Sequence, residues 1–285
     1  FNIEGCHFEN FAGDYWLYVE NNSDTYSIES VFIQKNTFLS LLGNARIPGN
    51  IGAPSSCIGA FGGPLDSATG NVKGMFIRDN SANCAYIKQF VNIWNNCVGV
   101  TIANNVIRSP GVSDPGFIDD GGGYGINIYQ QGAGGGSVAS RDVIITGNTI
   151  LAPRSAGVYV THGTALNISH NSISGQTDEE DGTLPKGAIA VQSASDVMIE
   201  SNIIQDCYAG ISVVAFGDTN SRTTVRHNQI VSSVASAYGM RLTVADDENA
   251  GSIEATDNYV VMSGTGTPSG IYCDIGTGYS LRHLS

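Results

Sequence analysis

The sequence has few charged residues, and cations are the scarcer kind. Only 14% of the 285 residues are charged, and 13 Lys and Arg face 26 Asp and Glu, which gives a net charge of −13. No cluster of Lys and Arg is present that could bind a polyanion, so nucleic acid and acidic membranes are expected to be poor partners. No apolar run reaches membrane-spanning length. We therefore predict no membrane insertion.

Helical periodicity is also missing, because no window of a dozen residues keeps an apolar face at 3.6-residue spacing. What is present instead is the octapeptide "VIITGNTI" at residues 143–150, which recurs along the chain. Its template has an apolar residue five before an Asn, another three before it and another two after it. The template gives nine copies, separated by 23 to 44 residues, centred on Cys6, Asn36, Asn80, Asn105, Asn148, Asn171, Asn202, Asn228 and Asn258.

A second element follows each Asn, with the pattern Gly, apolar, variable, apolar. It reads "GINI" at Gly125, "GVYV" at Gly157 and "GISV" at Gly210. Each copy thus supplies short strands that are too small to bury a core alone, so the copies must stack. Stacked strands predict a parallel β-solenoid with rungs about 4.8 Å apart. The Asn side chains would form an inward ladder at a corner, where Asn also tolerates left-handed backbone angles.

The consensus of these repeats resembles that of the pectate-lyase-like superfamily, whose fold is a right-handed parallel β-helix with three strands per rung. That superfamily includes polysaccharide lyases, polygalacturonases, alginate epimerases and bacteriophage tailspikes. The resemblance implies an all-β, single-stranded parallel β-helix of about nine rungs. We expect one domain over residues 1–285, and a chain that opens inside a repeat is expected to be a fragment of a longer one. Such a fold does not by itself give the function.

Two rows of side chains should point outward from the second element of each repeat. One row brings Phe61, Trp94 and Tyr129 onto consecutive rungs, and the neighbouring row contributes Asn127 and Tyr159. Aromatic rings stack on the C–H faces of sugars while amides bond their hydroxyls, so these residues predict a polysaccharide-binding surface. The alternative is that an insertion or a neighbouring subunit covers these aromatic residues.

Long insertions at one corner carry the acidic residues. "FIDDGGGYG" contains Asp119 and Asp120, "SGQTDEEDGTLPK" contains Glu179, and Arg154 comes from the rung between them. Two carboxyl groups about 6.5–9.5 Å apart are what an inverting glycosidase needs, and we take Asp119, Asp120, Glu179 and Arg154 as catalytic candidates. The paired Asp resembles that of polygalacturonases, but the other motifs of that family are missing. The competing interpretation of residues 178–181 is a solvated acidic loop that can hold calcium; no other cofactor or metal site is expected.

The residue four before each Asn should also point outward, from the first strand of the rung. Phe32, Phe76, Ile144 and Met198 make this row too apolar for a fully wet face. Phage tailspikes are parallel trimers of such helices, so pattern and resemblance together predict a homotrimer.

Six cysteines raise the possibility of disulfides. Cys6 occupies the ladder position and Cys273 an inward strand position, so we interpret them as small core residues. Unpaired cysteines suit a phage protein, which is assembled in a reducing cytoplasm and released outside the cell.

These observations predict a tailspike-type depolymerase that binds and cleaves a bacterial surface or extracellular polysaccharide, located on the virion surface or outside the cell. Two alternatives stay open. One is a secreted microbial polysaccharide lyase, hydrolase or epimerase, and the other is a receptor-binding or structural spike without catalytic activity.

Overall fold

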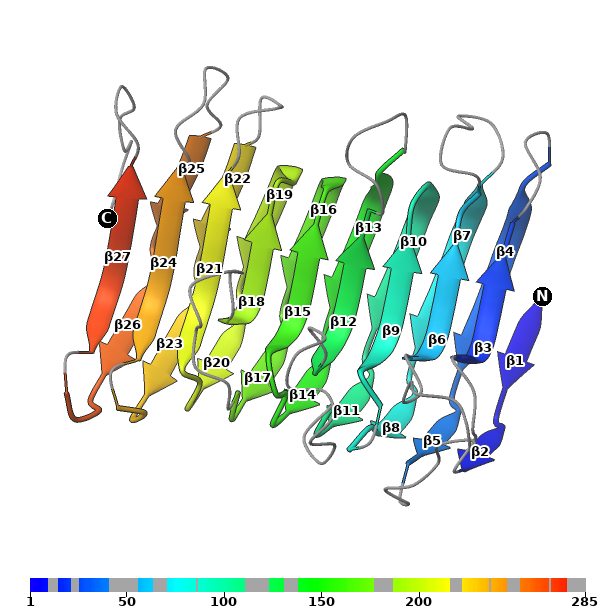
Figure 1. Ribbon diagram of the computed structural model, residues 1–285, viewed down its shortest axis with the longest axis horizontal. Helices are drawn as coiled ribbons and strands as arrows, with labels where there is room; N and C mark the ends of the chain where they lie inside the picture. The colour runs from blue at the N-terminus through cyan, green and yellow to red at the C-terminus, as the bar shows by residue number, and fades with distance from the viewer. Residues whose placement is uncertain are drawn as a thin grey trace, which may run out of the picture.

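The computed structural model is a solenoid built from strands, which stack from the N-terminal to the C-terminal end (Figure 1). It describes residues 1–9, 15–21, 26–40, 56–63, 71–85, 87–110, 123–130, 138–176, 187–215, 222–235, 237–244, 252–266 and 268–275. Within these residues there is no helix that is long and apolar enough to cross a membrane.

The strands form three parallel sheets of nine, and each rung contributes one strand to each sheet. Sheet A contains β1 (Asn2–Glu4), β4 (Ile28–Gln34), β7 (Val72–Arg78), β10 (Cys97–Ala103), β13 (Ser140–Thr146), β16 (Gly163–Ser169), β19 (Ser195–Glu200), β22 (Arg222–Arg226) and β25 (Ser252–Thr256). Sheet B contains β2 (His7–Glu9), β5 (Thr37–Leu39), β8 (Ser81–Asn83), β11 (Val106–Arg108), β14 (Thr149–Leu151), β17 (Ser172–Ser174), β20 (Ile203–Gln205), β23 (Gln229–Ser232) and β26 (Tyr259–Met262). Sheet C contains β3 (Tyr15–Glu20), β6 (Ser56–Phe61), β9 (Gln89–Trp94), β12 (Tyr124–Tyr129), β15 (Ala156–Thr161), β18 (Gly187–Gln192), β21 (Ala209–Ala215), β24 (Tyr238–Val244) and β27 (Ser269–Ile275). The predicted fold class and the nine rungs are confirmed.

The apolar positions of the sequence template form the rows of the core. The residue three before each Asn pairs with its counterpart on the next rung of sheet A, as Ile77 does with Ile102 and Ile102 with Ile145. These three side chains are fully or almost fully buried, as are Ile107 and Ile150, which lie two residues after the Asn. Because side chains alternate along a strand, burying one face in each sheet encloses a single core along the solenoid axis.

The Asn side chains form the predicted ladder at the corner between sheets A and B. The backbone N–H and Nδ2 of Asn171 both donate to Oδ1 of Asn202, at 2.9 and 3.0 Å. Nδ2 also donates to the carbonyl oxygen of Ile145 at 3.0 Å. The pattern repeats at each ladder Asn from Asn36 to Asn228, so buried backbone groups at the corner find partners within the ladder.

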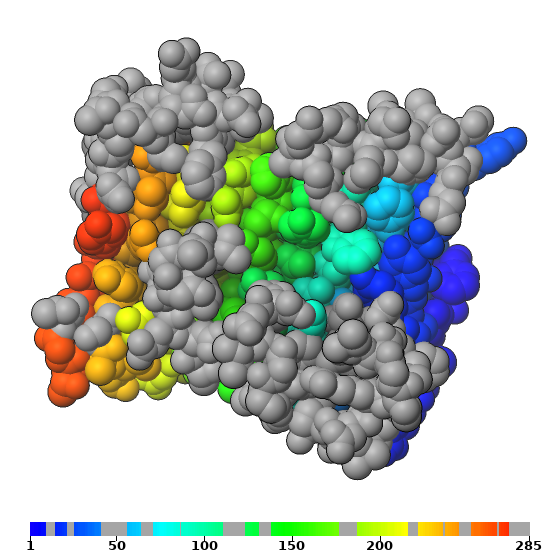
Figure 2. Space-filling model, in the orientation of Figure 1, coloured from blue at the N-terminus to red at the C-terminus, as the bar shows by residue number. Residues whose placement is uncertain are grey.

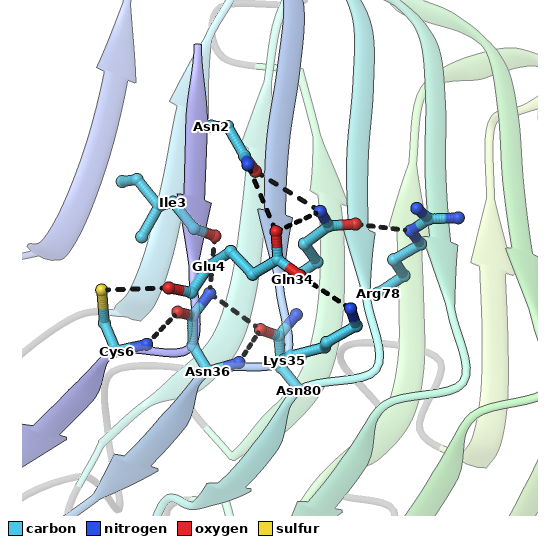
Figure 3. Close-up of polar contacts among 9 residues, drawn as sticks. All are labelled: Asn2, Ile3, Glu4, Cys6, Gln34, Lys35, Asn36, Arg78 and Asn80. Carbon is cyan, nitrogen blue, oxygen red and sulfur yellow. Dashed lines mark hydrogen bonds and ion pairs between the residues drawn. The ribbon is translucent and has the colours of Figure 1, made fainter.

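The first rung departs from this pattern because Cys6 takes the place of the Asn. Its backbone N–H donates to Oδ1 of Asn36 at 2.8 Å (Figure 3). Its thiol instead lies 3.6 Å from the carbonyl oxygen of Glu4, and Cys6 is exposed. The interpretation of Cys6 as a buried core residue is therefore wrong, since the end of the stack leaves this position open.

The left-handed residue at the corner is the one before the Asn, not the Asn itself. Its φ is 68° at Gly5, 65° at Gly147, 57° at His170 and 55° at His227. The ladder Asn therefore contributes hydrogen bonds, and the residue before it adopts the left-handed conformation that makes the turn. Gly relieves strain at such a position, whereas His and Lys adopt it at some cost.

Candidate functional site

The outer face of sheet C carries two rows of side chains in the register that the sequence predicts. The first row runs Tyr18, Gly59, Asn92, Asn127, Tyr159, Ala190, Ser212, Arg241 and Tyr272. The second row runs Glu20, Phe61, Trp94, Tyr129, Thr161, Gln192, Val214 and Thr243. Sheet C is drawn at the front of Figure 1, and Figure 2 shows its face in the same orientation.

Three aromatic residues of the second row lie side by side on β6, β9 and β12. Phe61 pairs with Trp94, and Trp94 pairs with Tyr129. Phe61 and Trp94 are half-buried, and 38% of the surface of Tyr129 is exposed. The strand spacing sets the backbones of these three residues about 4.8 Å apart from rung to rung. They form a partly exposed and largely apolar surface.

A second group of rings, at the N-terminal end of this face, includes one residue that the sequence did not reveal. Tyr15 stacks on Tyr18 with 4.6 Å between ring centroids, and Trp94 meets Tyr15 edge-on at 5.6 Å. Gly59 makes room for both tyrosines, because a Cβ at this position would overlap the ring of Tyr15. Tyr15 precedes the apolar alternation of its strand, so the repeat template gave no signal for it.

Tyr159, one of the predicted binding residues, is packed more tightly than expected. It stacks on Tyr124 with 4.7 Å between centroids and is only 6% exposed. Burial, with a smaller effect of the nearby Tyr129, raises the pKa of Tyr159 to about 12. The Tyr159 hydroxyl therefore keeps its proton at any ordinary pH. Tyr124, like Tyr15, belongs to the face but was not among the predicted residues.

Asn127 is likewise buried, because it is paired along the row rather than open to solvent. Its Nδ2 donates to Oδ1 of Asn92 at 3.0 Å. Oδ1 of Asn127 has no hydrogen-bond partner among the described residues, and the same holds for Thr161 Oγ1, Gln192 Oε1 and Ser212 Oγ. Buried polar atoms are normally paired. This face therefore contains a run of oxygen atoms whose hydrogen-bonding capacity is incomplete.

The predicted catalytic residues divide into one that the structure describes and three that it does not. Arg154 lies between β14 and β15, where its backbone N–H donates to the carbonyl oxygen of Pro110 at 3.3 Å. The stem of Arg154 packs close to Gly123, just before β12, so this arginine borders the sheet C face. Asp119, Asp120 and Glu179 lie outside the described residues, as does the proposed calcium loop at residues 178–181.

Among the described residues, neither a metal site nor a reactive thiol stands out. No group of three or more His, Cys, Asp or Glu side chains in that part of the chain could hold a metal ion. All six cysteines are free. Burial raises the pKa of Cys97 to about 12 and that of Cys207 to about 11, so these thiols stay protonated and are poor nucleophiles.

Comparison with known protein families gives one decisive match. The family model described as "Right handed beta helix region" matches residues 65–274. The chain belongs to this right-handed β-helix family. No curated protein matches the sequence.

Several solved structures are similar to this chain at low identity. An alginate lyase from Paenibacillus sp. str. FPU-7 is 14% identical, with 90% of this chain and 91% of that chain covered and a TM-score of 0.40. An endo-xylogalacturonan hydrolase from Aspergillus tubingensis is 11% identical, with coverages of 92% and 86% and a TM-score of 0.35. The ORF18 protein of Geobacillus virus E2 is 11% identical, with a TM-score of 0.34, and 90% of this chain covers 53% of that protein. These likenesses concern the fold alone.

A different face of the β-helix, on sheet A, carries the predicted apolar row. Phe32 stacks on Phe76 with 5.0 Å between centroids, and 43% of Ile144 is exposed. Met198 occupies the same row, and its Sδ lies 3.5 Å from Nη2 of Arg226, which donates a hydrogen bond to it. The row is outward-facing, as predicted, and it leaves apolar surface in contact with solvent.

Proposed function

We propose that this β-helix binds a bacterial surface or extracellular polysaccharide along the outer face of sheet C and cleaves it. The observation that carries the proposal is the row Phe61, Trp94 and Tyr129, which places three accessible rings on consecutive strands. Repeated ring faces at rung spacing suit a polymer with a repeating sugar unit, since each ring can stack on a sugar face. A small ligand would call for a closed pocket instead.

The proposed chemistry is acid–base cleavage at the corner that borders this face. Arg154 lies between β14 and β15, where sheet B connects to sheet C. The insertions with Asp119, Asp120 and Glu179 occur at the same connection, one rung before and one rung after it in the sequence. In this proposal one carboxyl group donates a proton to the departing glycosidic oxygen while another activates water. The Arg154 cation would favour the ionised form of the base.

The test is to incubate the protein with capsule and lipopolysaccharide preparations and to measure new reducing ends and ultraviolet-absorbing unsaturated products. Asp120→Asn should lower turnover by about 10²–10⁴-fold, the usual cost of removing a general acid or base, while binding remains. Asp142→Asn is the matched control, because Asp142 is an exposed residue on sheet A. Full activity in both the Asp119→Asn and the Asp120→Asn proteins would reject this pair as the catalytic carboxyls.

We further propose that the protein is a tailspike-type depolymerase on the virion surface or outside the cell, and that it acts as a homotrimer. The free cysteines support assembly in a reducing compartment. The outward row with Phe32, Phe76 and Ile144 supports burial of sheet A against a second copy. Sedimentation equilibrium should give a trimer that Ile144→Glu weakens, and a wild-type monomer at micromolar concentration would reject the trimer.

A further inference from the structure

The two outward rows of sheet C are uncharged over six consecutive strands, from β6 to β21. The first row consists of Gly59, Asn92, Asn127, Tyr159, Ala190 and Ser212 in this stretch, all of them buried beneath the outer surface. The second row presents Phe61, Trp94, Tyr129, Thr161, Gln192 and Val214. The structure describes all of these residues, and none of them has a charged side chain. From this stretch, and given the proposed function, we infer that the polysaccharide is an uncharged glycan and not a polyuronate.

A polyuronate carries carboxylates along its whole length, and each carboxylate that leaves water needs a charged donor such as Arg or Lys. The described strands of sheet C hold one basic residue, Arg241 on β24, beyond the uncharged stretch. Its guanidinium lies 5.9 Å above the ring of Tyr272. Lys88 and Arg154 lie at the border of the sheet, before β9 and β15. A bound polyanion would therefore have most of its charges opposite rings, amides and hydroxyls.

The groups that the face exposes are better matched by hydroxyl groups. Tyr129 is 38% exposed and Gln192 is half-buried, and both side chains are uncharged. A sugar hydroxyl can donate to, or accept from, a phenol or a side-chain amide. A carboxylate only accepts, and it would find no cation opposite it on these strands.

The charge of the whole protein points in the same direction. With a net charge of −13, the protein repels an approaching polyanion, which slows association and weakens binding at low salt. An uncharged polymer meets no such barrier. Its affinity should depend little on ionic strength, because it rests on ring stacking and neutral hydrogen bonds.

The experiment compares polymers that differ only in charge. Polygalacturonate and alginate are each paired with their carboxyl-reduced forms, in which the acid becomes a primary alcohol, and bacterial capsules with and without uronic acids extend the panel. Affinity is measured for the full chain at low and high salt. We expect uncharged polymers to bind at least about tenfold more tightly than their acidic counterparts, with little change on adding salt.

A charge variant tests whether the face itself is responsible. Gln192→Arg places a cation in the second row and should raise affinity for the acidic polymers relative to the reduced ones. Gln229→Arg adds the same charge at an exposed position of sheet B and should leave that ratio unchanged. Tighter wild-type binding to the acidic polymers would overturn the inference and leave polysaccharide binding intact. Binding to no polymer of either kind would reject the proposed function and the inference with it.

Discussion

Replacing Asn171 by leucine should destabilise the β-helix by breaking its ladder in the middle. Oδ1 of Asn171 accepts from the backbone N–H and from Nδ2 of Asn148, at 3.0 and 2.9 Å. Nδ2 of Asn148 keeps two carbonyl acceptors, those of Ile102 and Thr146. The buried backbone N–H of Asn148 loses the acceptor that the ladder provides. One unsatisfied buried backbone group costs about 1–3 kcal/mol, and we expect a loss of this size in the free energy of unfolding.

The matched control is Asn167→Leu, the same substitution on the same rung. Asn167 lies on the outer face of β16, and its buried Oδ1 has no partner among the described residues, so the substitution should destabilise the fold by no more than about 0.5 kcal/mol. Urea unfolding followed by tryptophan fluorescence compares the two variants. Hydrogen exchange of the Asn148 amide gives a local readout, which should lose protection in Asn171→Leu alone. Equal stability of both variants, with the Asn148 amide still protected, would refute the assigned role of the ladder.

Three further outcomes follow from the packing and protonation described above. Trp94→Ala should weaken polysaccharide binding by about tenfold or more, as loss of a central aromatic anchor does, whereas Phe32→Ala on sheet A should not; isothermal titration calorimetry separates the two. Iodoacetamide at mildly alkaline pH should label exposed Cys6 first and leave buried Cys97 unlabelled until the protein unfolds, as peptide mass mapping will reveal. The pKa of Tyr159 is raised by folding from its ordinary value of 10.0 to about 12, so its contribution to stability is complete below pH 10 and is lost as the pH rises through 12. Tyr159→Phe should therefore show a smaller loss of stability over this interval in alkaline denaturation curves, and identical curves would contradict the burial of the phenol.

The sequence was sufficient for the rungs, the ladder and the register of sheet C, because each depends on a local pattern that recurs. Asn105, Asn148 and Asn171 mark the same corner of successive rungs, and once that corner is fixed the alternation of a strand places every later residue inward or outward. The pairing of Phe61 with Trp94 could be predicted for this reason.

Burial on the outer face could not be predicted in the same way, since it depends on contacts between rungs that the template does not describe. The alternation places Tyr159 outward, but only the structure shows that the ring of Tyr124 covers it. Tyr15 was missed because it precedes the repeated element and reaches the face by stacking on Tyr18. The acidic candidates, such as Asp120, come from insertions that no repeat constrains, so their placement stays a prediction.

The ladder at the corner of sheets A and B has a consequence for how such proteins change in length. Every joint in it is chemically the same, because each Asn donates to the Oδ1 of the following one with nearly constant geometry. A gene segment that encodes one whole turn, such as the 23-residue interval between Asn148 and Asn171, could be duplicated or lost. The Asn residues on either side of the change could still form the same hydrogen bonds with each other. Recombination can thus lengthen or shorten the solenoid turn by turn, and with it the length of the sheet C face.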